Sequence, residues 1–163
     1  MSYPPPLYLG DSGESIATYR GAGHPPEVQR ATGTTVHYLA TGASTAGQFG
    51  LYRWEMGAGP GGPDPHFHRT ISESFYILSG TVRLFDGATW TEASPGDFLH
   101  VPQGGIHAFR NESGTPASML LLFAPGAPRE GYFEELAQIA ADQRDLSDEE
   151  WLDVYHRHDQ YPV

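Results

Sequence analysis

The sequence contains no cysteine and no lysine among its 163 residues. Without cysteine, neither a disulfide framework nor a thiolate metal site can form, so any metal site must use histidine and carboxylate ligands. The basic side chains are 9 arginines against 20 acidic residues, which gives a net charge of −11. Such a surface repels phosphate backbones, and no basic patch interrupts it, so we expect no nucleic-acid partner.

Long apolar runs are also lacking. No stretch approaches the roughly 20 apolar residues that a membrane-spanning helix needs, so we expect no membrane partner. Residues 1–6 lack the basic and apolar regions of a signal peptide. We therefore expect a cytoplasmic protein of one domain, since 163 residues suffice for a single hydrophobic core.

Glycine and proline, in contrast, are abundant, with 20 and 14 copies. They separate short strand-like runs at close spacing, a rhythm that is typical of an all-β barrel or jelly roll. The predicted strands are residues 35–40, 49–56, 66–67, 74–79, 81–85, 89–92, 97–101, 105–111 and 118–124. Residues 1–34 are rich in Pro, Gly and Ser, which predicts an N-terminal arm with no more than a short strand or a turn of helix.

Two helices are predicted after the last strand. Apolar residues recur at helical spacing between Tyr132 and Ala140, which indicates an amphipathic helix over roughly 130–143. Ser147-Asp-Glu-Glu150 has the pattern of a capping box that opens a second helix. We expect residues 126–163 to form a helical extension on the outside of a barrel at 35–125, within the same domain.

Four polar residues form the most informative pattern. His66 and His68 lie in a predicted strand, where alternate side chains share a face, and Glu73 and His107 follow. Three imidazoles and one carboxylate suit one divalent transition metal, whether iron, nickel, manganese, cobalt, copper or zinc. A second His-x-His pair at 156–158 has no carboxylate or histidine at matching spacing before Val163, so it does not carry the same prediction.

The pattern resembles the two motifs of the cupin superfamily. In the first motif a glycine precedes His-x-His, Glu and a final Gly, and here His66, His68, Glu73 and Gly80 fit, while the leading position falls on Pro60. The second motif matches at every position, in Gly96, Pro102, Gly104, His107 and Asn111. The resemblance implies a cupin jelly-roll β-barrel whose interior holds a metal on the two motifs' His and Glu residues.

Strand alternation also predicts the walls of a substrate pocket. The side chains two and four residues after Glu73 share its face, and another lies two residues from His107. The candidate pocket residues are Phe49, Leu51, Arg53, Phe75, Ile77, Phe109 and Leu121.

Two registers remain open for the strand at 49–56. If Leu51 and Arg53 face inward, the guanidinium needs an anionic partner, which favours a carboxylate or enolate substrate. If Tyr52 and Trp54 face inward instead, the pocket is aromatic and apolar.

The functional expectation comes from a closer resemblance. The run from Glu73 to Gly80, and Pro125-Gly126 leading to residues 132–136, resemble small single-domain cupins of the quercetin 2,3-dioxygenase-like group. That resemblance implies a metal-dependent dioxygenase of a small aromatic or enolic substrate, with open metal positions for substrate and dioxygen and with Glu73 as the catalytic base. It also implies a homodimer, in which the N-terminal arm is suited to strand exchange.

Two alternatives remain open. One is a cupin isomerase or polyketide cyclase that acts through a metal-bound enolate and needs no oxygen. The other is a metal-containing protein that binds a small molecule without catalysis. Oxygen dependence of turnover separates the first alternative from the dioxygenase, and a complete lack of turnover identifies the second.

Overall fold

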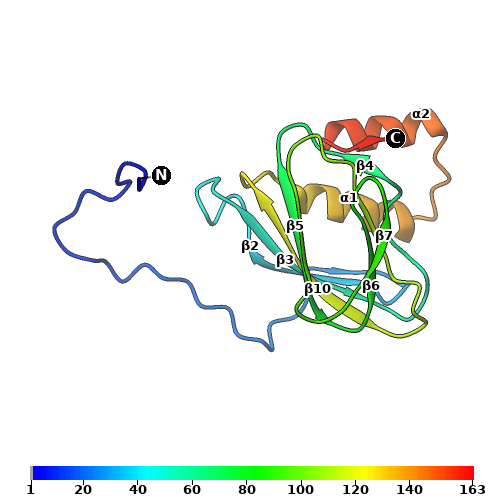
Figure 1. The fold of residues 1–163 in the computed structure, drawn as a ribbon, viewed down its shortest axis with the longest axis horizontal. Coiled ribbons are helices and arrows are strands. Elements are labelled where there is room, and N and C mark those ends of the chain that lie inside the picture. The colour runs from blue at the N-terminus through cyan, green and yellow to red at the C-terminus, as the bar shows by residue number, and fades with distance from the viewer. Residues whose placement is uncertain (1) are drawn as a thin grey trace.

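The computed structural model describes residues 2–163, so Met1 of the predicted arm lies outside the described residues. Strands dominate it, and two helices follow the last long strand (Figure 1). The strands are β1 Val28–Gln29, β2 Thr35–Ala40, β3 Gly50–Met56, β4 His66–Phe67, β5 Ser72–Ser79, β6 Val82–Phe85, β7 Trp90–Ala93, β8 Phe98–Val101, β9 Ala108–Arg110, β10 Ala117–Ala124 and β11 Tyr161–Pro162. The helices are α1 Arg129–Ala141 and α2 Asp148–Arg157.

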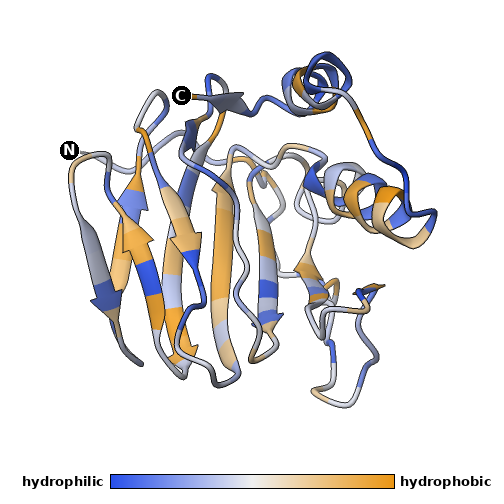
Figure 2. Ribbon diagram, turned by 90° about the vertical axis from the view of Figure 1, so that its right-hand side faces the viewer, coloured by the Kyte–Doolittle hydropathy of each residue, from blue (hydrophilic) through white to orange (hydrophobic). Residues whose placement is uncertain are grey.

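The strands form a jelly roll of antiparallel pairs. A six-stranded sheet has the order β1-β2-β3-β10-β5-β8, and a three-stranded sheet has the order β7-β6-β9. A third pair, β11 with β4, brings residues 161–162 next to Phe67 and His66. Figure 2 shows apolar segments along the strands of the large sheet and the helices lying beside one end of the sheets. The predicted all-β jelly roll with C-terminal helices is confirmed.

Alternation along β3 and β10 creates the core. In β3 every second residue is buried, from Gly50 to Met56, and β10 alternates in the same way from Ala117. β10 pairs with β3 on one side and with β5 on the other, so it lies in the middle of the sheet. Its buried Met119, Leu121 and Phe123 therefore face the interior together.

The two helices begin where the sequence indicates. At α2, the Ser147 side chain accepts a hydrogen bond from the Glu150 amide, and the Glu150 side chain accepts one from the Ser147 amide. This reciprocal capping box satisfies backbone donors that a helix start otherwise leaves unpaired. At α1, Tyr132, Phe133 and Ile139 are buried, so one face of that helix belongs to the core.

Two short strands lie outside the predicted ranges, although the first agrees with the short strand that the prediction allowed in the arm. β1 lies inside the predicted arm and pairs with β2, while residues 2–27 form no helix or strand and extend away from the body (Figure 1). β11 lies inside the predicted helical extension. Both are two residues long, too short for period-two alternation to reveal them. None of the helices in residues 2–163 is long and apolar enough to cross a membrane.

Candidate metal centre

Four buried side chains from three parts of the chain converge on one point inside the jelly roll. His66 belongs to β4, His68 follows that strand directly, Glu73 lies in β5 and His107 immediately precedes β9. One potential ligand atom from each residue lies within 4.8 Å of the others. All four residues are at most 4% exposed, so their donor atoms are largely shielded from bulk water. The sequence pattern that nominated these residues therefore corresponds to one spatial cluster.

The backbone sets which ring nitrogen of each histidine faces the centre. Nδ1 of His66 lies 2.8 Å from the Asp64 carbonyl oxygen, and Nδ1 of His107 lies 2.9 Å from that of Gly105. Nδ1 of His68 contacts the Asp159 carbonyl oxygen. A carbonyl can only accept, so each Nδ1 carries a proton and each Nε2 is directed at the centre, where a bound metal would take its lone pair.

Glu73 supplies the negative charge of the cluster. Its Oε2 atom lies 3.1 Å from Nε2 of His68 and 2.9 Å from Nε2 of His107. Burial by itself raises the pKa of Glu73, but the contacts with the two imidazoles outweigh it and hold the pKa below its usual value. Burial, aided by repulsion from His107, lowers the pKa of His66 to about 3. The cluster thus combines a carboxylate with a neutral imidazole at His66, the forms that ligate a metal.

Backbone pairing and one buried amide hold the two motifs together. His66 and His107 exchange backbone hydrogen bonds of 3.0 and 2.9 Å, which puts their side chains opposite each other. The Gly104 amide donates to the His68 carbonyl at 2.7 Å, and Gly104 has a φ of 80°, a conformation that favours glycine. The fully buried Asn111 side chain donates to the carbonyls of Gly57 and Thr115. The motif residues that are not ligands therefore shape the loops around the ligands.

The C-terminal segment also supports the site. Besides the contact between its carbonyl and His68, Asp159 accepts through its carboxylate from the amides of Arg69 and Thr70, at 3.1 and 2.9 Å. β11 follows two residues later and pairs with β4. The segment around Asp159 is therefore part of the shell that orients a metal ligand.

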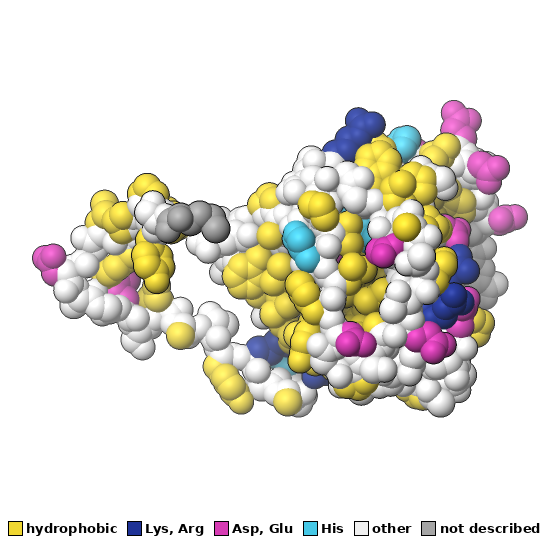
Figure 3. Space-filling model, viewed as in Figure 1, with side chains coloured by type: hydrophobic (Ala, Val, Ile, Leu, Met, Phe, Trp, Pro, Cys, Tyr) yellow, Lys and Arg dark blue, Asp and Glu magenta, His cyan; other side chains and the backbone are white. Residues whose placement is uncertain are grey.

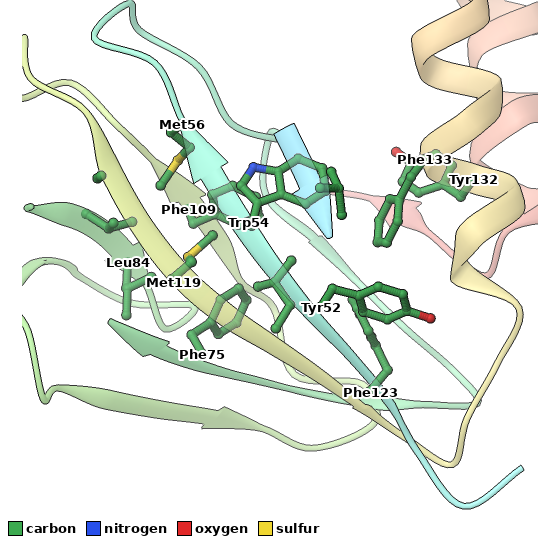
Figure 4. Packing of buried hydrophobic residues seen from close by; sticks show 14 of the residues in the cluster. Tyr52, Trp54, Met56, Phe75, Leu84, Phe109, Met119, Phe123, Tyr132 and Phe133 are labelled. Carbon is green, nitrogen blue, oxygen red and sulfur yellow. The ribbon is translucent and has the colours of Figure 1, made fainter. Parts of the chain in front are cut away.

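A cavity of about 530 Å³ opens beside His66 and Glu73. One side, which we call the sheet wall, consists of side chains of the jelly-roll strands: Trp54, Met56, His66, Glu73, Phe109, Leu121 and Phe123. The other, which we call the C-terminal wall, consists of Arg129, Tyr132, Phe133, Leu136, Trp151, Tyr155, Gln160 and Pro162. Residues from the 30–34 and 59–64 segments complete the lining. Figure 4 shows Phe133 and Tyr132 of α1 lying across from Trp54 and Tyr52 of β3.

Comparison with known proteins agrees with this geometry. Residues 52–123 match the family described as the cupin domain, and this segment includes all four clustered residues. This segment is therefore a cupin domain. Among solved structures, KdgF from Halomonas sp. aligns with a TM-score of 0.60 at 15% identity, covering 70% of this cupin and 97% of that chain. A structure described as a predicted oxalate decarboxylase from Thermotoga maritima aligns with a TM-score of 0.53 at 18% identity, covering 56% and 80%. At these identities the two alignments support the fold alone.

One curated relative is similar in sequence. Quercetin 2,3-dioxygenase of Bacillus subtilis is 35% identical to this cupin over 85 residues. The match covers 50% of this chain and 24% of that protein, so this cupin spans about a quarter of its relative's length. The likeness therefore concerns one stretch of a larger protein.

The structure places the candidate pocket residues in three groups. Phe109 and Leu121 line the cavity. Phe75 and Ile77 are fully buried in the core and do not line it, although the Phe75 ring lies 5.9 Å from the His107 ring. The remaining three, Phe49, Leu51 and Arg53, are also absent from the lining.

The register of β3 explains the last group. Tyr52 and Trp54 are the buried residues of this strand, and Leu51 and Arg53 take the opposite face. There Arg53 approaches His37, with Nη2 3.0 Å from Nε2, and its Nε lies 3.1 Å from Glu55. The aromatic register is therefore the one that forms, because the polar partners of Arg53 lie on the outer face of β2 and β3.

The second His-x-His pair, His156 and His158, makes structural contacts. Nε2 of His158 lies 2.7 Å from the Glu135 carboxylate, which joins the segment after α2 to α1. The His156 ring stacks on Tyr161 at 5.0 Å. Neither residue belongs to the metal cluster, in agreement with the lack of a matching carboxylate in the sequence.

Sequence reasoning missed most of the C-terminal wall. Tyr132 and Phe133 were recognised only as the apolar face of a helix, and Arg129 was not singled out at all. Helical spacing identifies which residues share a face, but not what that face covers. Only Pro128, directly before Arg129, indicates where α1 begins, and it does not predict that the arginine side chain turns inward.

Proposed function

We propose that this cupin is a metal-dependent dioxygenase that acts on a small aromatic or enolic compound. The observation that carries the proposal is the placement of a His₃Glu cluster beside a cavity of about 530 Å³ with aromatic walls. Sites for small molecules usually combine an apolar hollow with a few convergent polar groups. The likeness to quercetin 2,3-dioxygenase supports the oxygen-dependent reaction.

His66, His68, Glu73 and His107 would hold one divalent metal. Three neutral imidazoles and one carboxylate suit iron, nickel, manganese, cobalt, copper or zinc. When bound, such an ion supplies Lewis acidity at the coordination positions that the protein leaves open. The protein's own contribution is to fix the tautomer of each histidine and to keep the carboxylate dry.

Glu73 is suited to a second role as a proton acceptor. Its Oε2 atom receives the contacts from His68 and His107, whereas Oε1 has no hydrogen-bond partner within residues 2–163, and Glu73 lines the cavity. A substrate hydroxyl placed against Oε1 could transfer its proton there while Oε2 remains the oxygen that would hold the metal. Trp54 and Phe109 of the sheet wall would hold the substrate's apolar body beside that oxygen.

Oxygen consumption tests the proposal. Protein loaded separately with iron, nickel, manganese, cobalt or copper is mixed with flavonols and simpler enolic aromatics, and oxygen uptake is followed with an electrode. We expect uptake with at least one metal and none with His66→Ala. His156→Ala, which changes a histidine outside the cluster, serves as the matched control and retains activity. Uptake no higher than that of His66→Ala with every metal and substrate would reject the dioxygenase.

A further inference from the structure

The cavity is lined by a buried arginine side chain that has no role in the proposed metal chemistry. Arg129 is 4% exposed and lines the cavity from the first turn of α1. Its Nη1 donates to the His158 carbonyl at 2.6 Å, while Nε is buried with no hydrogen-bond partner. Within residues 2–163, no carboxylate forms an ion pair with it. A buried guanidinium without an anion is costly, so the unpaired donor requires an explanation.

A second guanidinium lines the same cavity. Arg30, just after β1, has Nε and Nη2 buried without partners in the described part of the chain, and its guanidinium lies 5.9 Å from the centre of the Trp54 ring. The cavity is therefore lined by two arginines from opposite ends of the domain. Both use aromatic rings rather than acids as neighbours, since Arg129 lies 4.6 Å from the Tyr132 ring and 5.1 Å from that of Phe123.

The acidic groups that line the cavity form no direct ion pair with these arginines in residues 2–163. Glu73 is engaged by two histidines of the metal cluster. Asp64 has a side chain that is 88% exposed and pairs with Arg110 at 2.9 Å. With a divalent ion on the cluster, the lining carries a local positive charge inside a protein whose net charge is −11. An anion that enters the cavity gains from the arginines as well as from the metal.

From these contacts we infer that the cavity takes an aromatic substrate bearing a carboxylate, with the carboxylate on Arg129 and Arg30 and the ring against the aromatic side chains of the two walls. The inference rests on the proposed function, because it names the substrate class for the same site. A guanidinium presents donors in a planar fork that matches a carboxylate. Nε of Arg129 and Nε and Nη2 of Arg30 are buried without a hydrogen-bond partner in the described residues, so both guanidiniums keep unpaired donors.

Benzoate and its neutral isostere benzamide provide the test. Each is titrated by calorimetry into the full chain loaded with zinc, a metal the ligand set accepts that does not change oxidation state. We expect benzoate to bind at least tenfold more tightly than benzamide. In Arg129→Met this preference disappears, while zinc content stays near one equivalent. In Arg53→Met, a control on the outer face of β3, the preference is unchanged.

Two results would overturn the inference. One is equal binding of benzoate and benzamide by the unaltered protein. The other is a full preference for benzoate in folded, zinc-replete Arg129→Met, which would place the carboxylate on the metal alone. If Arg129→Met does not fold, the NMR resonance of the Arg129 Nε–H in the unaltered protein decides. A shift with benzoate and none with benzamide supports the inference, and no shift with saturating benzoate contradicts it. Because the titration needs no turnover and no oxygen, its failure leaves the dioxygenase proposal to its own assay.

Discussion

The two walls of the cavity present different chemistry. The sheet wall carries the metal ligands His66 and Glu73, which the pleat and the backbone pairing of neighbouring strands hold in place. The C-terminal wall carries no metal ligand, and it brings a buried arginine and the rings of α1. The sheet wall thus sets where chemistry can occur, and the C-terminal wall determines much of what can reach it.

Because the two walls differ, we expect metal binding to be separable by substitution from stability and ligand choice. The protein as a whole is acidic, and Figure 3 shows Asp and Glu side chains spread over one face of the body. The buried cations therefore stand out against their surroundings. A change in the sheet wall should affect the metal first, whereas a change in the C-terminal wall should affect stability or ligand choice while the metal stays.

The largest expected effect lies in the metal cluster, two of whose residues belong to the sheet wall. His68→Ala removes one of three imidazoles, and we expect metal content to fall from about one equivalent per chain to a small fraction of that, since the loss of a ligand weakens metal binding. Elemental analysis of freshly purified protein measures this. His156→Ala should retain its metal. Full metal content in His68→Ala would show that the cluster is not the site.

A large effect without metal loss is expected in the C-terminal wall. Phe133 is 3% exposed, and its ring lies 5.2 Å from those of Tyr52 and Trp54. Phe133→Ala should lower the free energy of unfolding by about 3–5 kcal/mol, the usual cost of such a cavity. Leu152→Ala, at an exposed position of α2, should change it by less than about 0.5 kcal/mol. Denaturant titrations of both variants make the comparison, and a mild effect of Phe133→Ala would mean that α1 packs only loosely on the sheet.

Asp159 lies next to Gln160 of the C-terminal wall and contacts His68 of the metal cluster, and we expect an intermediate effect there. Asp159→Ala removes the acceptors for the amides of Arg69 and Thr70, and the residue has a φ of 56° that alanine adopts poorly. The carbonyl that orients His68 is then held less firmly, so metal affinity should fall by about 10-fold or more. Competition with a chelator measures it. Asp159→Asn keeps an acceptor and tolerates this φ, so it should lose less. Unchanged affinity in Asp159→Ala would show that the tail does not orient His68.

The smallest effect concerns pH and the contact between α1 and the segment after α2. The hydrogen bond with His158, aided by Arg157, lowers the pKa of Glu135. A lowered folded-state pKa stabilises the protein above the unfolded value of about 4.3, and that stabilisation is lost as the pH falls through the folded value. Solvent screens the pair, so Glu135→Gln should cost about 0.5 kcal/mol at pH 7 and nothing at pH 2. Denaturant titrations at the two pH values test this, and an equal cost at both would assign the loss to packing.

The metal cluster was predictable because its information is local. His66 and His68 share a strand face, and the turn residues around them, such as Gly104, have backbone conformations that few other residues adopt. Spacing along the chain therefore translates directly into position. The capping box of α2 was predictable for the same reason, since Ser147 and Glu150 are three residues apart.

The cavity walls were less predictable because their information is tertiary. In β3 both faces carry residues that can be buried, and the choice depends on the partners His37 and Glu55 that meet Arg53 on the outside. The inward direction of Arg129 depends on α1 docking against strands that are distant in the sequence. Hydrophobic periodicity and residue propensities do not predict how α1 packs on the sheet. The pocket residues predicted from strand alternation were therefore an incomplete set.

The contact between Asp159 and His68 has a consequence for the order of events during synthesis. The two residues are 91 positions apart, and β11, which pairs with the strand of His66, follows Asp159. A ribosome therefore releases all four ligands well before it releases the carbonyl that sets the tautomer of His68. Until that last segment pairs with β4, His68 lacks the partner that holds its Nε2 toward the centre. Tight metal capture should accordingly be a late step of biogenesis, timed by the arrival of residues 159–162.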